Sequence, residues 1–392
     1  MTTVAHGNRI GYLDFLRGIA VLGLLLMNIT DMGMFSFGYV SPDPTPVSDD
    51  IIQVLRMGVF DGRFRSLFCL LFGIGLYLQF ESFSRNGLDA QAVLKRRLWW
   101  LLAIGFVHGI LIWPGDILTA YALCGFLVIR HLDWNAQDLI KRGIVFFIIG
   151  IAFDLLLLAS SWSSDTSGVE DSSMLYEYAE LMPEGYLGYV VENAIWVGSI
   201  LAVFPFLLLF YVSSIMYLGL GLFKHGQLKS GFGKFGMWML LVSTAVVSIT
   251  DMLLYFFAPD IAYNVSGFFG SISGLTMAML IWHWVLRSKV YLRKTFLTDA
   301  ILRCGRMALT MYLMQSIVGV TLLRFIYPEW DLTATLLDFT LLALCMIVAQ
   351  LFIAYHYFQY FTQGPIEFMW RKLVNVNANI GNIETSDNAK HS

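Results

Sequence analysis

Long apolar segments recur along the whole chain, and they constrain its fold more than any other feature. The protein has 31 phenylalanines and 11 tryptophans among its 392 residues, and only 14% of the residues are charged. This composition leaves too little polar surface to coat a soluble protein of that length. A run of about 20 apolar residues is long enough to cross a bilayer as a helix. The sequence therefore predicts an all-α, polytopic integral membrane protein.

We expect about ten transmembrane helices from the hydropathy pattern. They cover roughly 18–37, 64–83, 98–113, 116–129, 144–160, 194–223, 235–258, 265–286, 307–327 and 334–361. The third and fourth are short and meet at Trp113-Pro114-Gly115. Pro114 cannot continue the incoming helix without the loss of a backbone hydrogen bond, so these two helices form either a tight hairpin or a partly re-entrant pair.

Charge alternates between the connections. Lysine and arginine gather in every second one, for example in 85–97 and 287–306, whereas the intervening connections are acidic, as in 165–184. Basic residues favour the cytoplasmic side of a membrane, so the pattern predicts both termini in the cytoplasm and an even number of spans.

The domain organisation follows from the same pattern. We expect a single polytopic membrane domain over 1–373 and a disordered polar tail over 374–392. Within the domain, N-terminal spans (9–160) and C-terminal spans (194–373) flank an outer acidic segment, 161–193, which is expected to carry a short amphipathic helix.

Several classes of function find no support. The four cysteines lie apart, in or beside apolar segments, and none forms a cluster with histidine at metal-ligand spacing. We therefore expect neither a disulfide framework nor a metal site. No basic block suggests binding to nucleic acid. The lipid bilayer is the expected partner.

His108 and Asp116 bracket the Trp-Pro-Gly break. An ionisable group at hydrocarbon depth costs on the order of a few kcal/mol, so this pair indicates a functional site. At about 1.5 Å per residue, His108 lies roughly 7 Å below the outer end of its helix. A histidine beside a carboxylate can act as a general base. Two structural alternatives stay open: Asp116 caps the following helix, and His108 is a buried histidine bonded to a carbonyl group.

Other polar residues fall at a similar depth. Arg63 and Arg65 break the charge rule on the predicted outer side, where they serve either an interfacial helix that reaches lipid phosphates or a substrate site. Under both interpretations we expect these arginines near the outer membrane boundary. Further polar residues toward the outer half are Asn28, Asp31, Asp154, Asp251 and Asp338. Together with His108 and Asp116 they could line one cavity.

Several motifs resemble those of the bacterial YeiB family. They are Tyr12-Leu-Asp14-Phe-Leu-Arg17-Gly18, Phe64-Arg65-Ser-Leu-Phe-Cys69 and Gly115-Asp116-Ile-Leu-Thr-Ala-Tyr121. The family's C-terminal block of unknown function resembles Gly305-Arg306-Met-Ala-Leu-Thr-Met-Tyr312-Leu-Met-Gln315 and Gly364-Pro365-Ile-Glu367-Phe-Met-Trp370-Arg371. The resemblance runs from about residue 9 to 373 and implies a multi-pass protein of the bacterial cytoplasmic (inner) membrane.

The opening Leu-Asp14-Phe-Leu-Arg17-Gly is also similar to that of the transmembrane acyltransferases of family three and the lysosomal heparan glucosaminide acetyltransferases. That resemblance implies transfer of an acyl group from a cytoplasmic donor such as acetyl-CoA to an acceptor across the membrane. The family-three pattern places a histidine where this chain has Asn28. Asparagine cannot act as a general base, although its amide can orient an acceptor or donate to an acyl oxygen. His108 with Asp116 is the nearest replacement.

Five of the candidate residues belong to the cytoplasmic half. Asp14 and Arg17 either form an ion pair one helical turn apart or contribute to a donor-phosphate or substrate site. Gln315 either hydrogen-bonds between helices or contacts substrate. Arg306, with Arg371 in the last motif, either meets an anionic donor or only follows the positive-inside rule.

The favoured function is transfer of an acyl group to a cell-envelope or exported small substrate. His108 and Asp116 are the candidate catalytic residues, and the candidate substrate-binding residues are Asn28, Arg63, Arg65, Asp14, Arg17 and Gln315. Arg306 and Arg371 would hold the donor. Acyl-CoA is the expected co-substrate, and we expect no permanently bound cofactor. The expected acceptor is a small molecule or a glycan. A homodimer is a candidate assembly. A transporter or channel for a small solute, and a non-catalytic scaffold or sensor, are the alternatives.

Overall fold

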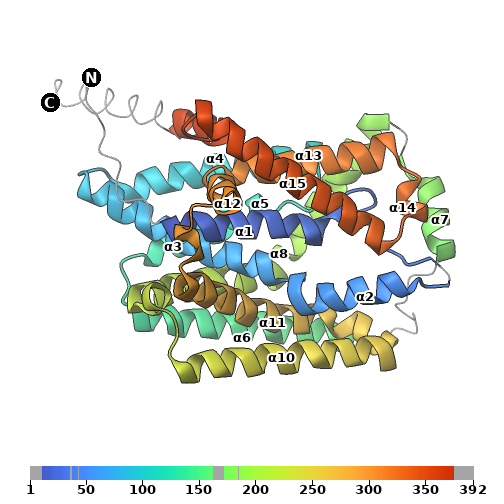
Figure 1. Ribbon diagram of the computed structural model, residues 1–392, viewed down its shortest axis with the longest axis horizontal. Helices are drawn as coiled ribbons and strands as arrows, with labels where there is room; N and C mark the ends of the chain where they lie inside the picture. Colours follow the sequence, from blue (N-terminus) through green and yellow to red (C-terminus); the bar gives the residue numbers. More distant parts are fainter. Residues whose placement is uncertain (1–10, 36–37, 43, 162–171, 184, 375–392) are drawn as a thin grey trace.

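A computed structural model describes residues 11–35, 38–42, 44–161, 172–183 and 185–374, and every regular element within these ranges is helical. The long helices lie roughly along one axis and form a single bundle (Figure 1). The prediction of an all-α, polytopic membrane protein is therefore confirmed.

Each predicted span falls on one helix. These helices are α1 (Gly11–Asn28), α3 (Arg63–Arg85), α4 (Ala90–Leu111), α5 (Leu118–Val128), α6 (Ala136–Ser161), α8 (Gly185–His225), α10 (Lys234–Phe257), α11 (Pro259–Ser288), α13 (Ala308–Val320) and α15 (Leu336–Tyr360). By length and hydropathy, the described residues contain 8 segments able to cross a membrane, two of which, Gly185–Phe206 and Leu208–His225, belong to α8. The number of crossings stays a prediction.

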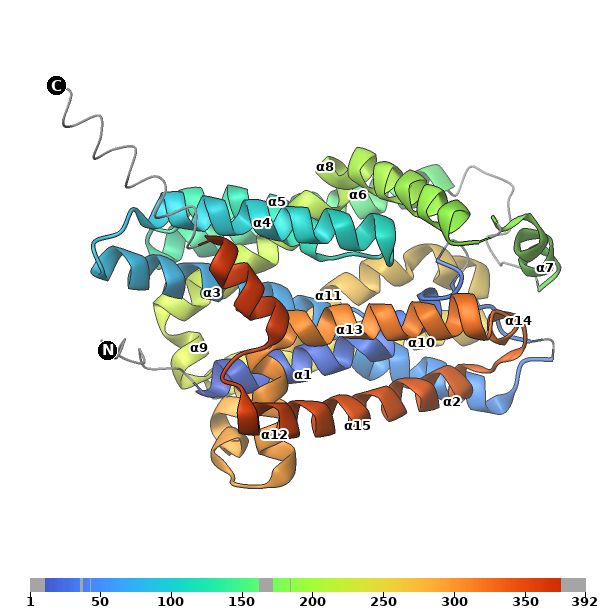
Figure 2. The same cartoon turned by 90° about the horizontal axis from the view of Figure 1, so that it is seen from above.

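Short elements join these helices. They are η1 (Ile29–Asp31), α2 (Val47–Leu55), the π-helical turn η2 (Arg56–Phe60), η3 (Ile129–His131), α7 (Ser172–Leu181), α9 (Gln227–Ser230), η4 (Val290–Leu292), α12 (Phe296–Arg306), η5 (Thr321–Ile326) and α14 (Trp330–Thr333). In both views α7 and α14 lie at one end of the bundle, and Figure 2 shows α9 and α12 toward the other end. This separation agrees with the charge pattern of the connections, whereas the side that faces the cytoplasm stays a prediction.

The expected outer acidic segment contains α7, a short helix as predicted. Residues 162–171 and 184 of that segment, and residues 375–392 of the expected polar tail, lie outside the described residues.

Helix α1 runs through the core, whereas α10 lies at the periphery. Of the most apolar 18 residues in the α1 segment, 72% are buried inside the protein, whereas the value for α10 is 17%. Most of α10 therefore faces the surroundings of the bundle, as a helix in contact with lipid does. Glycines permit the closest packing of α1 against α12. A Cβ atom on Gly305 would lie 1.7 Å from the Asp14 carbonyl oxygen, and one on Gly18 would lie 2.1 Å from that of Ile301. Small residues of this kind allow membrane helices to approach each other.

Helices α4 and α5 form a hairpin around the Trp113-Pro114-Gly115 break. The amide groups of Ile112 and Trp113 both donate to the His108 carbonyl oxygen at 2.9 Å, and the α-helix then ends. Figure 2 shows that α4 stops short of the end at which α7 and α14 lie. The hairpin tip is therefore set back inside the bundle.

Candidate functional site

His108 and Asp116 form a buried pair at the tip of this hairpin. Nδ1 of His108 lies 3.0 Å from Oδ1 of Asp116, and the two side chains are 1% and 3% exposed. The second carboxylate oxygen, Oδ2, accepts a hydrogen bond of 2.7 Å from the Thr119 amide in the first turn of α5. Asp116 therefore orients the imidazole and caps the helix at the same time, and His108 does not bond to a carbonyl group through Nδ1.

The other imidazole nitrogen is unpaired. Nε2 of His108 is buried and has no hydrogen-bond partner among the described residues. Because an aspartate carboxylate accepts hydrogen bonds, the contact with Asp116 places the proton of a neutral His108 on Nδ1. Nε2 then carries a lone pair that can accept a proton.

Tyr312 of α13 completes the immediate surroundings of the pair. Its ring centroid lies 5.3 Å from that of His108, and its hydroxyl accepts a hydrogen bond of 3.2 Å from the Ile117 amide. Tyr312 belongs to a motif that resembles the YeiB family, but the motif did not indicate a role for it. Tyr312 is 195 residues from Ile117 along the chain, so no local pattern could have indicated this contact.

The first turns of α8 hold the exposed carbonyl end of α4. Tyr186 donates to the Leu111 carbonyl oxygen at 2.8 Å, Tyr189 to that of Ile112 at 2.7 Å, and Asn193 to that of Ile110 at 3.2 Å. The last carbonyl groups of a helix have no partner within it, and at membrane depth such groups need another donor. These three side chains thus supply the hydrogen-bond donors that the end of α4 lacks.

An apolar cluster covers the site on the side of α14. Its buried members are Leu25, Ile29, Met32, Trp113, Tyr189, Val320, Leu323, Phe339 and Ala343. Trp113 is fixed within it by a hydrogen bond of 2.9 Å from its indole nitrogen to the Asp31 carbonyl oxygen. The pair is consequently shielded from the end of the bundle at which α14 lies.

Beyond this cluster, charged groups gather at the end of the bundle that carries α7 and α14. Arg324 lies 3.7 Å from Glu192 and also attracts Asp331. Burial, with a smaller contribution from the Asp31 carboxylate, raises the pKa of Asp331 from 3.8 to about 7, while Arg324 opposes the shift. Sequence analysis did not single out Arg324, although a charge near the end of an apolar span is a detectable signal.

Arg63 faces the protein interior. It is 1% exposed and donates to the carbonyl oxygens of Met57 and Asp61 and, at 2.9 Å, to the Ser248 hydroxyl. These bonds hold η2 against α10, so the alternative in which Arg63 reaches lipid phosphates is wrong, whereas its position near the outer membrane boundary stays a prediction. Arg65 is half-buried with its guanidinium 5.6 Å from the centre of the Tyr211 ring.

Asp14, Arg17 and Gln315 make contacts within the protein. Asp14 and Arg17 form the ion pair expected for residues one turn apart, at 2.7 Å. Gln315 donates to the Val21 carbonyl oxygen at 3.0 Å and to the side chain of Gln350 at 2.9 Å, which joins α13 to α1 and α15. Asn28 is half-buried, and its side chain forms no hydrogen bond with the described part of the chain.

The motif from Gly364 to Arg371 binds the C-terminal segment to the rest of the bundle. Glu367 accepts hydrogen bonds from the amides of Leu309 (2.8 Å) and Thr310 (3.2 Å) and so caps α13. Trp370 donates to the Arg97 carbonyl oxygen at 3.3 Å, and the Arg97 guanidinium lies 4.3 Å from its ring centre.

The two candidate donor-binding arginines lie near this segment. Arg306 packs 4.6 Å from the ring centre of Phe358 and donates to the Thr362 carbonyl oxygen, whereas Arg371 is exposed and close enough to repel Arg97. Among the described residues, no group of three or more histidine, cysteine, aspartate or glutamate side chains could hold a metal ion.

Comparison with known proteins gives consistent matches. The family described as "Protein of unknown function (DUF418)" matches residues 217–377. The "Uncharacterized protein YeiB" of Escherichia coli is 29% identical over 388 residues, which cover 92% of this chain and 95% of the relative. Over nearly its whole length the chain resembles proteins of the YeiB family. A second relative, "Uncharacterized protein YxaH" of Bacillus subtilis, is 27% identical over 93% of both chains.

The YeiB relatives match this chain beyond the DUF418 region. That region contains Tyr312, Gln315 and Glu367, whereas His108 and Asp116 precede it and fall in the part covered by the longer matches. An uncharacterized 39.9 kDa protein of Bacillus acidopullulyticus is 36% identical over 129 residues, or 33% of this chain. None of these names states an activity.

Proposed function

We propose that this protein is a membrane acyltransferase in which His108 acts as the general base. One observation carries the proposal: Nδ1 of His108 is held by Asp116, while Nε2 is buried and has no partner among the described residues. A carboxylate that fixes the imidazole tautomer, with a free lone pair on the other nitrogen, is the arrangement that general-base catalysis uses. A histidine with a purely structural role usually satisfies both ring nitrogens.

The reaction would use an acyl-CoA thioester and a hydroxyl group on a cell-envelope or exported small molecule. The acceptor hydroxyl gives its proton to Nε2 of His108, and its oxygen forms a bond to the acyl carbon. The carbon–sulfur bond of the thioester breaks, and the leaving thiolate takes the proton from Nε2. Proton transfer of this kind contributes about 10²–10⁴-fold to a rate.

Asn28 supports the proposal as a candidate donor to the acyl oxygen. Its side chain is half-buried, without a hydrogen bond to the described residues, and lies one helical turn before Asp31. The carbonyl oxygen of Asp31, in η1 directly after α1, accepts from Trp113 of the hairpin, so the chain that follows Asn28 meets the hairpin break. An amide N–H group directed at an acyl oxygen stabilises the negative charge that develops there.

The experiment measures transfer of label from acetyl-CoA to an envelope extract by the purified protein. His108→Gln should lower the rate by about 100-fold or more, because it removes the base. The matched control is His356→Gln, since His356 is an exposed histidine on α15 that lies outside the site. Its rate should equal that of the wild type.

Two outcomes would contradict the proposal. One is labelling by His108→Gln at the wild-type rate. The other is the absence of any labelled product from the wild type together with uptake of a solute into proteoliposomes, which would assign the buried polar groups to a transport path instead.

A further inference from the structure

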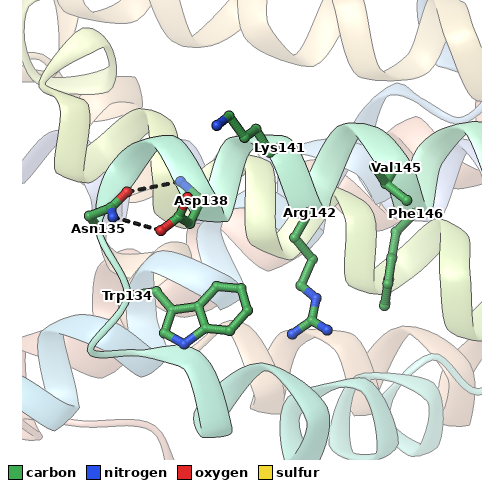
Figure 3. A pocket seen from close by; sticks show the side chains of 7 residues that line it. All are labelled: Trp134, Asn135, Asp138, Lys141, Arg142, Val145 and Phe146. Carbon is green, nitrogen blue, oxygen red and sulfur yellow. Dashed lines mark hydrogen bonds between the residues drawn. The ribbon is translucent and has the colours of Figure 1, made fainter.

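A pocket of about 610 Å³ opens between the end of α5 and the first turns of α6, at the other end of α5 from the hairpin tip (Figure 3). It is lined by Trp134, Asn135, Asp138, Lys141, Arg142, Val145 and Phe146. The pocket lies at the predicted cytoplasmic end, because Lys224 at the end of α8 donates to the carbonyl oxygens of Leu132 and Trp134 beside it.

Arg142 is held in place within this pocket. Its guanidinium lies 4.7 Å from the ring centre of Trp134 and 5.5 Å from that of Phe146, and it donates to Nε2 of His131 at 2.5 Å. His131 can accept this bond because its Nδ1 lies 3.1 Å from the Leu127 carbonyl oxygen and donates there. The guanidinium also interacts with the side chain of Tyr217, and its five N–H groups exceed the number of these contacts, so it can donate to a ligand as well.

The rim of the pocket is also ordered. Asn135 caps α6 by accepting a hydrogen bond of 2.9 Å from the Asp138 amide, and its own amide donates to the Asp138 carboxylate at 2.7 Å. Figure 3 shows both contacts at the start of the helix, with Arg142, Trp134 and Phe146 on one side of α6 and Lys141 on the other. The pocket is lined by two cationic side chains, Lys141 and Arg142, and by one carboxylate, that of Asp138. Its net positive charge favours an anionic ligand.

The pocket continues into the lipid-facing surface of α6. Ile144, Val145 and Ile148 are 48%, 52% and 60% exposed, and on a membrane helix such apolar side chains contact acyl chains. Trp134, at 38% exposed, is the kind of residue found at the membrane–water interface. A ligand that combines a negative headgroup with an apolar tail matches both parts.

We propose that this pocket binds the phosphate group of an anionic phospholipid. Arg142 contacts the phosphate, Lys141 on the other side of α6 adds to the positive charge of the pocket, and the acyl chains run along Ile144, Val145 and Ile148. Basic pockets between membrane helices on the cytoplasmic side have the charge and position that such headgroups require, and guanidinium–phosphate contacts are among the stronger hydrogen bonds. The inference does not depend on the acyl-transfer proposal.

The test compares retention of phosphatidylglycerol and phosphatidylcholine by the detergent-purified protein in native mass spectrometry. The wild type should bind phosphatidylglycerol about tenfold more tightly, a difference of about 1.4 kcal/mol. Arg142→Gln and Lys141→Gln should each remove most of this preference. Lys141 is exposed, so its replacement leaves the fold intact even if Arg142→Gln does not fold. Lys234→Gln, an exposed lysine at the start of α10 outside the pocket, should keep the preference.

Other results would overturn the proposal. Equal binding of the two lipids by the wild type, or an unchanged preference in Lys141→Gln, would remove the pocket as an anionic lipid site. Glycerol phosphate and unlabelled phosphatidylglycerol can each be added as a competitor of bound phosphatidylglycerol. If both displace it at the same concentration, the occupant is a soluble phosphate ester.

Discussion

At the scale of single residues, Asp116 divides its carboxylate between two contacts. One oxygen holds Nδ1 of His108, and the other accepts the Thr119 amide at the start of α5. Sequence analysis could predict that His108 and Asp116 lie close together, because they bracket a break between two short helices. From the sequence, capping of α5 and orientation of His108 were alternative roles for Asp116. The structure shows that the two oxygens of its carboxylate serve both roles.

A substitution of Asp116 separates these contacts. Asn is as good a helix cap as Asp, so Asp116→Asn should retain the stability of the hairpin. Its amide has no negative charge and can donate to Nδ1, which would favour the wrong tautomer of His108. We expect the rate of acyl transfer to fall by about 10²–10⁴-fold with an unchanged thermal unfolding midpoint. Loss of stability with full activity per folded molecule would instead leave Asp116 with the capping role alone.

At the scale of elements, the α4–α5 hairpin depends on the absence of a side chain at Gly105. A Cβ atom there would lie 2.6 Å from the Thr119 amide nitrogen and 2.7 Å from Oδ2 of Asp116. Gly105 thus lets the two helices approach closely enough for the His108–Asp116 contact to form. The Pro114 break predicted a tight or re-entrant pair, but not the three α8 side chains that hold its carbonyl end.

Gly105→Ala should therefore destabilise the protein by about 1–3 kcal/mol, because the methyl group forces α5 away from α4. The measurement is the thermal unfolding midpoint of the detergent-purified protein. Gly198→Ala on α8 is the matched control, since a Cβ atom there meets nothing within 4 Å. Its midpoint should stay the same or rise, and an equal fall in both variants would argue against close packing at Gly105.

At the scale of the whole molecule, the span pattern was predictable because each span is a run of apolar residues of bilayer length. The start of α8 was not, since the predicted span began only at residue 194. The helix begins at Gly185 and continues past Pro205. The contacts of Tyr312, Arg63 and Gln315 bridge distant parts of the chain. Only packing decides such contacts, so the sequence left their roles open.

The orientation predicted from charge can be measured with cysteine labelling. Glu180 on α7 and Lys229 on α9 are exposed and lie toward opposite ends of the bundle. With Cys345 replaced by alanine, the native cysteines Cys69, Cys124 and Cys304 are all buried. An impermeant maleimide should then label Glu180→Cys on intact cells, and Lys229→Cys only after permeabilisation. The reverse pattern would invert the topology.

The length of α8 has one more consequence. Its 41 residues extend roughly 60 Å at about 1.5 Å per residue, twice the hydrocarbon thickness of about 30 Å. The helix must tilt, bend at Pro205 or protrude, and a change in bilayer thickness alters that balance. Tyr189 and Asn193 near its beginning hold the hairpin, and Lys224 near its end holds the rim of the pocket. A change in membrane thickness would thus affect the hairpin and the pocket together, because both contact α8.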